Sequence, residues 1–173
     1  MATCYQWMDS PTGQLLLVAD ETGLRQVAFA AGRTPPRVAP SWQQDDRYLR
    51  EAMRQLRSFF AGTLERFDLP LRPAGTDFQQ SVWSQLCLIP YGQTISYGEL
   101  ARRLGNPAAS RAVGLANGSN PIAIIIPCHR VIGSNGKLTG YGGGLENKQW
   151  LLDFERRQLS LGFGQDRSKP NGR

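Results

Sequence analysis

A cysteine and the single histidine of the chain are adjacent, at Cys128 and His129, and they follow an apolar run from Ile122 to Pro127. The thiolate of a cysteine is a strong nucleophile, whereas a free thiol has a pKa of about 8.5 and is mostly protonated at neutral pH. A nucleophilic Cys128 therefore needs a base or a cation beside its sulfur. The apolar run predicts a buried strand that holds the thiol in a fixed place.

Side chains of neighbouring residues point to opposite faces of a strand, so Cys128 and His129 meet only if the backbone bends. Arg130, Gly133 and Gly136, which follow the histidine, permit such a bend. Further along the chain, Glu155 is expected to point inward, and its carboxylate could orient the histidine as in other activated nucleophiles. The alternative is a buried core cysteine beside a surface histidine, and spacing alone favours this alternative.

The composition is that of a globular protein with one domain or two small ones: 173 residues, 40% hydrophobic and 20% charged. Twenty Lys and Arg against 14 Asp and Glu give a net charge of +6. This excess favours phosphate-rich partners, although many basic proteins never bind nucleic acid. Neither a signal peptide nor a run long enough to span a membrane is evident, and we expect a cytoplasmic protein with no membrane partner.

Three cysteines, an odd number, indicate reduced thiols rather than a disulfide framework. The cysteines and His129 show no metal-ligand spacing, so no metal is expected. Cys4 and Cys87 have no comparable surroundings in the sequence. Cys87 lies beside an apolar helix face and is expected in the core.

The first part of the chain predicts a small α+β unit, and nothing in its sequence suggests a catalytic role. The segments "GQLLLVAD" and "LRQVAFA" flank a turn that contains glycine and predict a hairpin, and "GRTPPRVAPS" predicts a loop. Between Gln43 and Ala61 the apolar residues have helical spacing, at Leu49, Met53, Leu56 and Phe60. The segment "ERFDLPL" is expected to return as a third strand.

The second part begins after "RPAG" and predicts mainly helices. "TDFQ" at 76–79 has the spacing of a capping box, and "SYGE" at 96–99 repeats that pattern before a second helix. After the turn "GNPAAS", the segment "RAVGLAN" predicts a short helix, which gives the outline of a helix-turn-helix. Ordinary helical hairpins have the same outline. A last helix from about Leu145 to Gln158 carries Lys148, Leu152 and Glu155 on one face.

The segment "IPCHRVIG", preceded by "RAVGLANGSNP" and followed by "GKLTGYGGG", closely resembles the O6-alkylguanine-DNA alkyltransferases, also called methylated-DNA–protein-cysteine methyltransferases. The resemblance to the bacterial type covers about Gly75 to Glu155, with several motifs in order, and extends more loosely to "SPTGQLLLVAD". It implies an α+β protein with a ribonuclease-H-like domain over residues 1–74. A mainly helical DNA-binding alkyltransferase domain with the helix-turn-helix would span 75–163, and residues 164–173 are expected to form a disordered tail.

The resemblance also implies the reaction. A DNA repair protein of this family flips out O6-alkylguanine, or O4-alkylthymine, and transfers the alkyl group irreversibly to its own cysteine, here Cys128. His129 would remove the thiol proton through a water, Glu155 would hold the imidazole, and Asn120 would brace this network. Tyr97 would donate a hydrogen bond to the leaving base, on which negative charge develops. The product thioether has no easy leaving group, so we expect a single-turnover transferase without a cofactor.

The residues implied to bind DNA lie on the short helix. Arg111 matches the family's arginine finger, which would replace the extruded nucleotide and recover part of the few kcal/mol that extrusion costs. The alternative is an exposed arginine that binds phosphate. Ala112 and Gly114 are small and would allow this helix to approach the minor groove closely. We expect a monomer, with cooperative assembly on DNA as the alternative.

The glycine-rich stretch is implied to close one side of the base pocket. Tyr141 would be a wall of the pocket, and the backbone N–H groups of Val131 and Gly142 would contact the base. Many relatives have serine where Gly142 stands; a backbone contact survives this difference, but the order of the loop is put in doubt. The sequence leaves open the preference between guanine and thymine lesions and the tolerance for bulky adducts.

Two other functions compete with this interpretation. Alkyltransferase-like proteins bind damage but lack the cysteine, and the presence of Cys128 argues against that class. A cysteine hydrolase would turn over repeatedly and would need an oxyanion hole. The fate of the alkyl group discriminates among the three classes.

Overall fold

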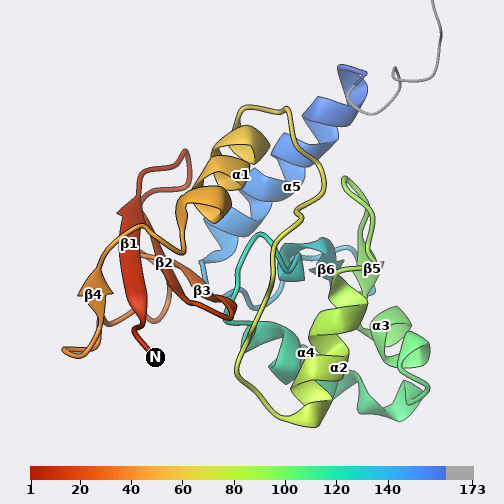
Figure 1. The fold of residues 1–173 in the computed structure, drawn as a ribbon. Helices are drawn as coiled ribbons and strands as arrows, with labels where there is room; N and C mark the ends of the chain where they lie inside the picture. The colour runs from red at the N-terminus through yellow and green to blue at the C-terminus, as the bar shows by residue number, and fades with distance from the viewer. Residues whose placement is uncertain (163–173) are drawn as a thin grey trace, which may run out of the picture.

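The structure, a computed structural model, describes residues 1–162, so the predicted tail at 164–173 lies outside the described residues. It is an α+β fold in which a sheet and one helix from the first part of the chain lie against a helical second part (Figure 1). The sheet has the order β3-β2-β1-β4, and its strands are β1 (Cys4–Met8), β2 (Leu15–Asp20), β3 (Gly23–Phe29) and β4 (Gln43–Gln44).

The predicted hairpin is confirmed as the antiparallel pair β2–β3, with Leu15 opposite Phe29. All six residues of β2 are buried, which explains its continuous apolar sequence. The strand β1 pairs with β2 on its other side and was not expected, because its polar and apolar residues do not alternate regularly.

The helix predicted from Gln43 begins later, since α1 spans Arg50–Phe60. Gln43 and Gln44 form β4 instead and pair in parallel with β1. The carbonyl oxygen of Asp46 accepts the N–H groups of Leu49 and Arg50, at 2.8 and 3.0 Å, and so starts the helical turn. The helix ends where expected, just before Gly62, whose φ of +75° suits glycine.

The third strand expected at residues 65–71 is wrong. Only an isolated bridge between Leu24 and Leu71 forms there. The side chain of Gln55 on α1 satisfies the backbone of Asp68 instead, through hydrogen bonds of 2.9 Å to its carbonyl and from its N–H. Pro70 lacks an N–H group and could not donate to a ladder.

The helices of the second part are α2 (Asp77–Leu86), α3 (Tyr97–Arg103), α4 (Ser110–Gly118) and α5 (Leu145–Ser160). The capping box of α2 is confirmed, because Thr76 and Gln79 exchange hydrogen bonds of 2.9 and 3.2 Å. The Ser96 hydroxyl likewise accepts the N–H of Glu99 at the start of α3. The turn between α3 and α4 contains a short 3-10 helix, Pro107–Ala109, which completes the predicted helix–turn–helix sequence of elements.

The predicted strand from Ile122 to Pro127 is wrong. Apart from an isolated bridge at Ile122, the segment folds into tight turns. The N–H of Ile125 donates to the carbonyl of Ala123, and the N–H of Ile126 donates to the carbonyl of Ile122. Ile124 has a φ of +71°, which no strand permits. The run is apolar because it is buried on every side. A further correction concerns Cys87, which is exposed at the end of α2 rather than in the core.

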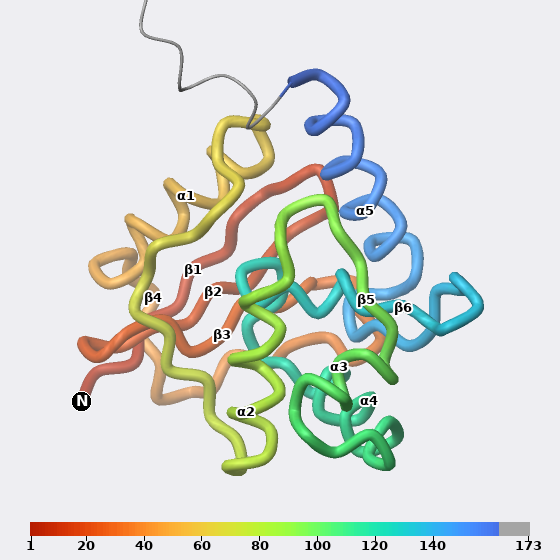
Figure 2. The backbone as a smooth tube through the Cα atoms, turned by 90° about the vertical axis from the view of Figure 1, so that its right-hand side faces the viewer, coloured from red at the N-terminus to blue at the C-terminus, as the bar shows by residue number. Residues whose placement is uncertain are grey.

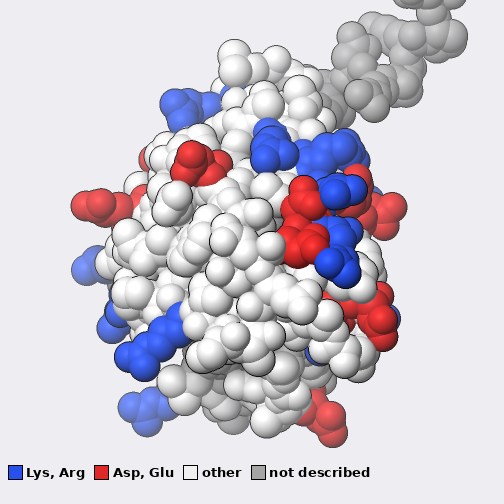
Figure 3. Space-filling view, turned by 60° about the vertical axis from the view of Figure 1, so that its left-hand side comes forward, with Lys and Arg blue, Asp and Glu red and all other residues white. Residues whose placement is uncertain are grey.

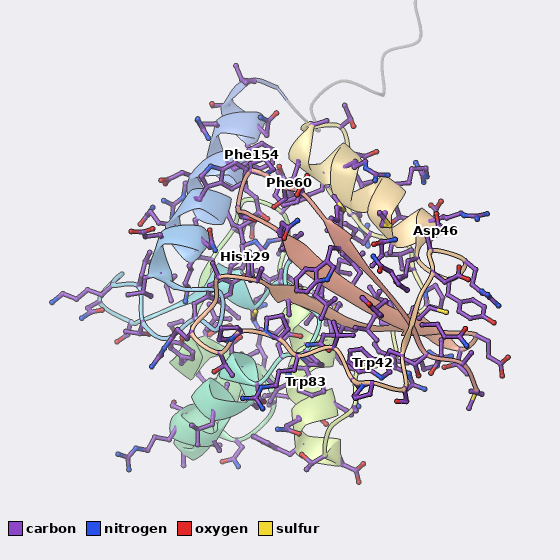
Figure 4. All side chains as sticks on the ribbon, turned by 90° about the vertical axis from the view of Figure 1, so that its left-hand side faces the viewer. Trp42, Asp46, Phe60, Trp83, His129 and Phe154 are labelled. Atoms are coloured by element: carbon purple, nitrogen blue, oxygen red, sulfur yellow. The ribbon has the colours of Figure 1, made fainter. Side chains whose placement is uncertain are left out.

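The two parts share one hydrophobic core, and aromatic side chains of α1 and α5 meet at their junction. The two helices overlap closely in the view of Figure 1 and lie on either side of the upper part of the molecule in Figure 2. Phe59 contacts Phe154 with ring centroids 5.6 Å apart, and Phe60 contacts Trp150 at 5.9 Å. Figure 4 shows Phe60 and Phe154 in the upper part of the molecule, above His129. No helix within residues 1–162 is long and apolar enough to cross a membrane. The domain boundaries at residues 74 and 163 stay predictions.

Candidate active site

Cys128 begins a single-turn 3-10 helix, Cys128–Arg130, which supplies the bend that the sequence left open. Asn120 holds this turn in place: its Nδ2 donates to the carbonyl of Ile126 at 2.9 Å and to Sγ of Cys128 at 3.1 Å. Its Oδ1 accepts the N–H of Ile122 at 3.0 Å. A donor aimed at sulfur favours the thiolate over the thiol. Asn120 therefore fixes both the position and the charge preference of Cys128.

His129 and Glu155 form a fully buried pair, with 2.8 Å between Nε2 of the imidazole and Oε1 of the carboxylate. Arg130 binds the same carboxylate through Nε and Nη2, and the N–H of Gly92 donates to Oε2. Burial raises the pKa of the Glu155 carboxyl, but His129 and Arg130 outweigh burial and bring the pKa to about 2. Glu155 is therefore a carboxylate at neutral pH.

The protonation of His129 follows from this pairing. Burial lowers the pKa of the imidazole below its ordinary value, although Glu155 opposes the effect. The neutral ring then carries its proton on Nε2, facing the carboxylate, and leaves Nδ1 as an acceptor. Nδ1 is buried and has no hydrogen-bond partner among the described residues. No direct hydrogen bond joins His129 to the thiol of Cys128 within residues 1–162, so a proton passing between them requires an intermediary.

Cys128 is only 5% exposed, and burial raises the pKa of its thiol above the ordinary value. The Asn120 hydrogen bond and the charge of Lys148 counteract part of this effect. Lys148 is itself fully buried, and its Nζ donates to the carbonyl of Thr139 at 3.0 Å. The free thiol is therefore protonated at neutral pH and needs a base to become a nucleophile.

A cavity of about 210 Å³ opens onto Cys128 and is lined by both parts of the chain. Tyr141, which is 3% exposed, lines this cavity. The exposed Gly142 follows it along the rim. The first part of the chain contributes Gln26, Val27, Ala28, Phe29 and Thr34.

Val131 is fully buried at the start of β6 (Val131–Ile132), which pairs with β5 (Ile95–Ser96). Its N–H donates to the carbonyl of Cys128, where it ends the 3-10 turn. Contact between this N–H and a base would therefore have to replace an existing hydrogen bond.

A second, wider groove of about 740 Å³ lies beside the thiol cavity and shares four lining residues with it, Thr34, Gly118, Tyr141 and Gly142. Arg111 and Gly114 of α4 line this groove, together with Tyr97. The hydroxyl of Tyr97 lies 3.3 Å from the carbonyl of Thr139.

The helix face at this groove combines charge, small residues and exposed apolar surface. Arg111 is exposed, and no ion pair of its guanidinium is found within residues 1–162. A side chain at Gly114 would contact the Tyr97 ring at 3.7 Å, so the two elements pack closely. Ala112 is exposed on α4 but does not line the groove. Leu115, one turn after Arg111, is 78% exposed and adds an apolar element that sequence reasoning passed over.

On part of the surface the basic side chains are interspersed with acidic ones. Figure 3 shows a face on which acidic and basic side chains lie beside one another. Within residues 45–54, three ion pairs of this kind form, Arg47–Asp45, Arg50–Asp46 and Arg54–Glu51. Arg111 and Arg33, which are both exposed and line the wider groove, have no such ion pair within residues 1–162.

Several residues around the thiol were not identified as site residues from the sequence. Asn117, buried on α4, donates to the carbonyl of Cys128 at 3.4 Å. Lys148 was placed on an inward face, but nothing in the spacing indicated the thiol as its neighbour. Phe29 and Val27 come from the part of the chain that showed no sign of chemistry, and only the tertiary structure brings them to the cavity.

Metal ligands do not gather anywhere in the described part of the chain: residues 1–162 contain no group of three or more His, Cys, Asp or Glu side chains that could hold an ion. The polar atoms around Cys128 come instead from Asn120, Tyr141 and Lys148.

Comparison with known proteins covers almost the whole described part of the chain. Residues 77–157 match the family model "6-O-methylguanine DNA methyltransferase, DNA binding domain", and residues 3–73 match the ribonuclease-like domain of the same methyltransferases. The chain is 56% identical to the methylated-DNA–protein-cysteine methyltransferase of Methanosarcina acetivorans, covering 87% of this chain and 97% of the relative. It is 51% identical to the Mycobacterium tuberculosis protein of the same name, covering 88% and 92%.

Solved structures give the same result. The Mycobacterium tuberculosis OGT in complex with DNA superposes with a TM-score of 0.83 at 49% identity, covering 90% of this chain and 94% of that one. The Mycobacterium tuberculosis O6-methylguanine methyltransferase superposes with a TM-score of 0.82 at 48% identity, covering 92% and 99%.

Proposed function

The chain belongs to the 6-O-methylguanine DNA methyltransferase family, and from this premise we propose a mechanism of DNA repair in which Cys128 accepts the alkyl group. Its class of enzyme is methylated-DNA–protein-cysteine methyltransferase, which transfers the alkyl group to a cysteine of the protein itself. The observation that supports Cys128 as that cysteine is its place on a cavity, hydrogen-bonded to Asn120 and next in sequence to the His129–Glu155 pair.

The first step creates the nucleophile. Nδ1 of His129 takes the proton of the Cys128 thiol through a bridging water. Because Glu155 accepts a hydrogen bond from Nε2, it stabilises the imidazolium that forms. Asn120 and Lys148 stabilise the thiolate, the first by a hydrogen bond and the second by its charge.

The second step transfers carbon. The sulfur of Cys128 attacks the alkyl carbon on O6 of guanine, a carbon–sulfur bond forms, and the carbon–oxygen bond breaks. The electron pair of the broken bond stays on the base, where Tyr97 stabilises the developing negative charge by donating a hydrogen bond. The base then takes a proton from solvent to become guanine, and the imidazolium of His129 releases the thiol proton to solvent. O4 of alkylated thymine presents the same kind of leaving oxygen. Because the thioether is stable, each molecule acts once and needs no cofactor.

DNA is the partner of this chain: residues 77–157 match a DNA-binding domain, and a relative 49% identical is known in complex with DNA. We propose that α4 enters the minor groove of an alkylated duplex. The groove beside the thiol cavity would receive the strand, and Arg111 would occupy the gap left by the flipped nucleotide. Gly114 and Ala112 allow close approach, while Tyr141 and Gly142 would enclose the base. The protein would act as a monomer in the cytoplasm.

Incubation with a duplex that carries one radiolabelled O6-methylguanine tests this function. The expected result is transfer of one equivalent of label to the protein, and none to a Cys128→Ser variant. Tight binding of the duplex without any transfer would indicate a damage sensor instead. Labelled methanol that keeps accumulating would indicate a hydrolase.

A further inference from the structure

We propose that the N-terminal sheet positions the acceptor site, through an arm formed by β3 and the turn after it, residues 23–34. This positioning arm holds two separate segments that line the thiol cavity, residues 120–123 and residues 141–143. The inference rests on the proposed function, because it assigns a role in alkyl transfer to a part of the chain with no reactive residue near Cys128.

The first attachment is a backbone connection to the Asn120 segment. β3 is an edge strand on the side of the sheet toward the helical part (Figure 1). The N–H of Val27 donates to the carbonyl of Pro121 at 3.0 Å, and the carbonyl of Val27 accepts the N–H of Ala123 at 3.0 Å. These two bonds fix the backbone directly after Asn120, whose amide holds the thiol. The sheet edge thereby continues into the acceptor site.

The second attachment is to the loop that walls the cavity. The N–H of Arg33 donates to the carbonyl of Gly142 at 2.8 Å. A Cβ atom at Gly32 would lie 2.6 Å from that same carbonyl oxygen, closer than real Cβ atoms approach. Gly32 does not have a positive φ, so its backbone would accept alanine. Residue 32 is therefore restricted to glycine by the close approach of the Gly142 carbonyl, and not by its backbone conformation.

The third attachment is aromatic. Phe29, the last residue of β3, meets the Tyr141 ring edge-on, with centroids 5.8 Å apart. A Cβ atom at Gly143 would lie 2.4 Å from Cδ2 of Phe29 and 2.9 Å from Cε1 of Tyr141. Both rings are almost completely buried. Phe29 therefore fixes the distance between the cavity wall and the sheet.

The positioning arm thus contacts both segments of the cavity lining, residues 120–123 and residues 141–143. Val27 contacts the segment that carries the donor to the thiol, whereas Phe29 and Gly32 contact the other segment that lines the cavity, residues 141–143. One strand thus sets the separation between the sulfur and the surface that would enclose the base. Reaction geometry is sensitive to such spacing, since a misplacement of about 1 Å can cost about a hundredfold in rate.

The variant Gly32→Ala tests the arm, because its methyl group must displace Gly142. The control is Leu56→Ala, which removes a fully buried side chain of α1 that lines neither cavity. For each folded protein, three quantities are measured: the single-turnover transfer rate at saturating methylated duplex, the Kd for that duplex, and the rate at which iodoacetamide alkylates Cys128. Thermal denaturation gives the stability of each variant.

For Gly32→Ala we expect the transfer rate at saturating duplex to fall about tenfold to a hundredfold. The Kd for the duplex should rise by a smaller factor, because the displaced Gly142 also lines the groove that would receive the strand. We expect iodoacetamide to alkylate Cys128 faster, because the Tyr141 wall is displaced. Leu56→Ala should lose stability and keep the wild-type value of all three quantities. Unchanged rates in Gly32→Ala, or equal changes in Leu56→Ala, would overturn the proposal. Where Gly32→Ala does not fold, Phe29→Leu is judged on the same quantities. If the wild type transferred no methyl group, the proposed function would fail, and the iodoacetamide rates would still decide on the arm.

Discussion

Nε2 of His129 lies 2.8 Å from Oε1 of Glu155, and neither side chain is exposed to solvent. This pairing determines which nitrogen of the imidazole is available to the thiol, and it fixes the orientation of the ring. Arg130 shares the carboxylate, so Glu155 is also part of the charge balance of the core.

Replacing Glu155 with Gln should slow alkyl transfer about a hundredfold to ten-thousandfold, because the imidazolium loses its stabilising charge. The same change leaves Arg130 buried without a counterion and should cost about 3 kcal/mol of folding free energy. Single-turnover kinetics and urea denaturation measure the two effects. A folded Glu155→Gln protein with the wild-type transfer rate would contradict the role of Glu155.

Stability should fall as the solution becomes acidic. The pKa of Glu155 is about 2 in the folded protein against an ordinary value of 4.5, so the unfolded chain binds more protons between these values. The stabilisation is fully present above pH 4.5 and is lost as the pH falls toward 2, by about 3 kcal/mol in total. The lowered pKa of His129 acts in the same direction below its ordinary value of 6.5. Urea denaturation from pH 7 to pH 3 checks this slope, which below pH 4.5 should be shallower in Glu155→Gln because the contribution of the carboxyl is gone.

Arg111→Ala should slow repair of a methylated duplex about a hundredfold, since only extrusion of the nucleotide is impaired. Reaction with the free base O6-methylguanine should keep its rate. The matched control is Arg54→Ala, which removes an exposed arginine that already pairs with Glu51. Equal losses on duplex and free base would remove Arg111 from the extrusion step.

Asn120→Ala should raise the pKa of Cys128 further, because the sulfur loses the hydrogen bond from Nδ2. The rate of Cys128 alkylation by iodoacetamide, measured against pH, reports this pKa through its midpoint. The midpoint should move to higher pH in the variant, and alkyl transfer at neutral pH should slow accordingly. A midpoint unchanged from wild type would show that Asn120 acts on backbone geometry alone.

Local sequence signals predicted local structure well. The capping box of α2 was visible because Thr76 and Gln79 satisfy each other's backbone within one turn. At α3 only half of the predicted box forms, since Ser96 accepts the N–H of Glu99 while the Glu99 carboxylate pairs with Arg102 and Arg103. The inward face of α5 followed from helical spacing, and Lys148, Leu152 and Glu155 are all buried as predicted. The ribonuclease-like first part was implied by resemblance and is confirmed by its family match.

The errors arose where tertiary contacts override local pattern. A continuous apolar run is typical of a buried strand, but the run from Ile122 to Pro127 satisfies its backbone through turns and Asn120. The helix predicted from Gln43 lost its first residues to pairing with β1. The contacts of Phe29 and Val27 with the thiol cavity join residues about 100 positions apart, and no spacing rule reaches that far.

Peptide mass spectrometry of the protein after one exposure to duplex DNA containing O6-methylguanine tests the central claim most directly. The account predicts one added methyl group on Cys128, none on Cys4 or Cys87, and a lesion restored to guanine in equal amount. A lesion that is repaired while the sulfur of Cys128 stays unmodified would contradict it.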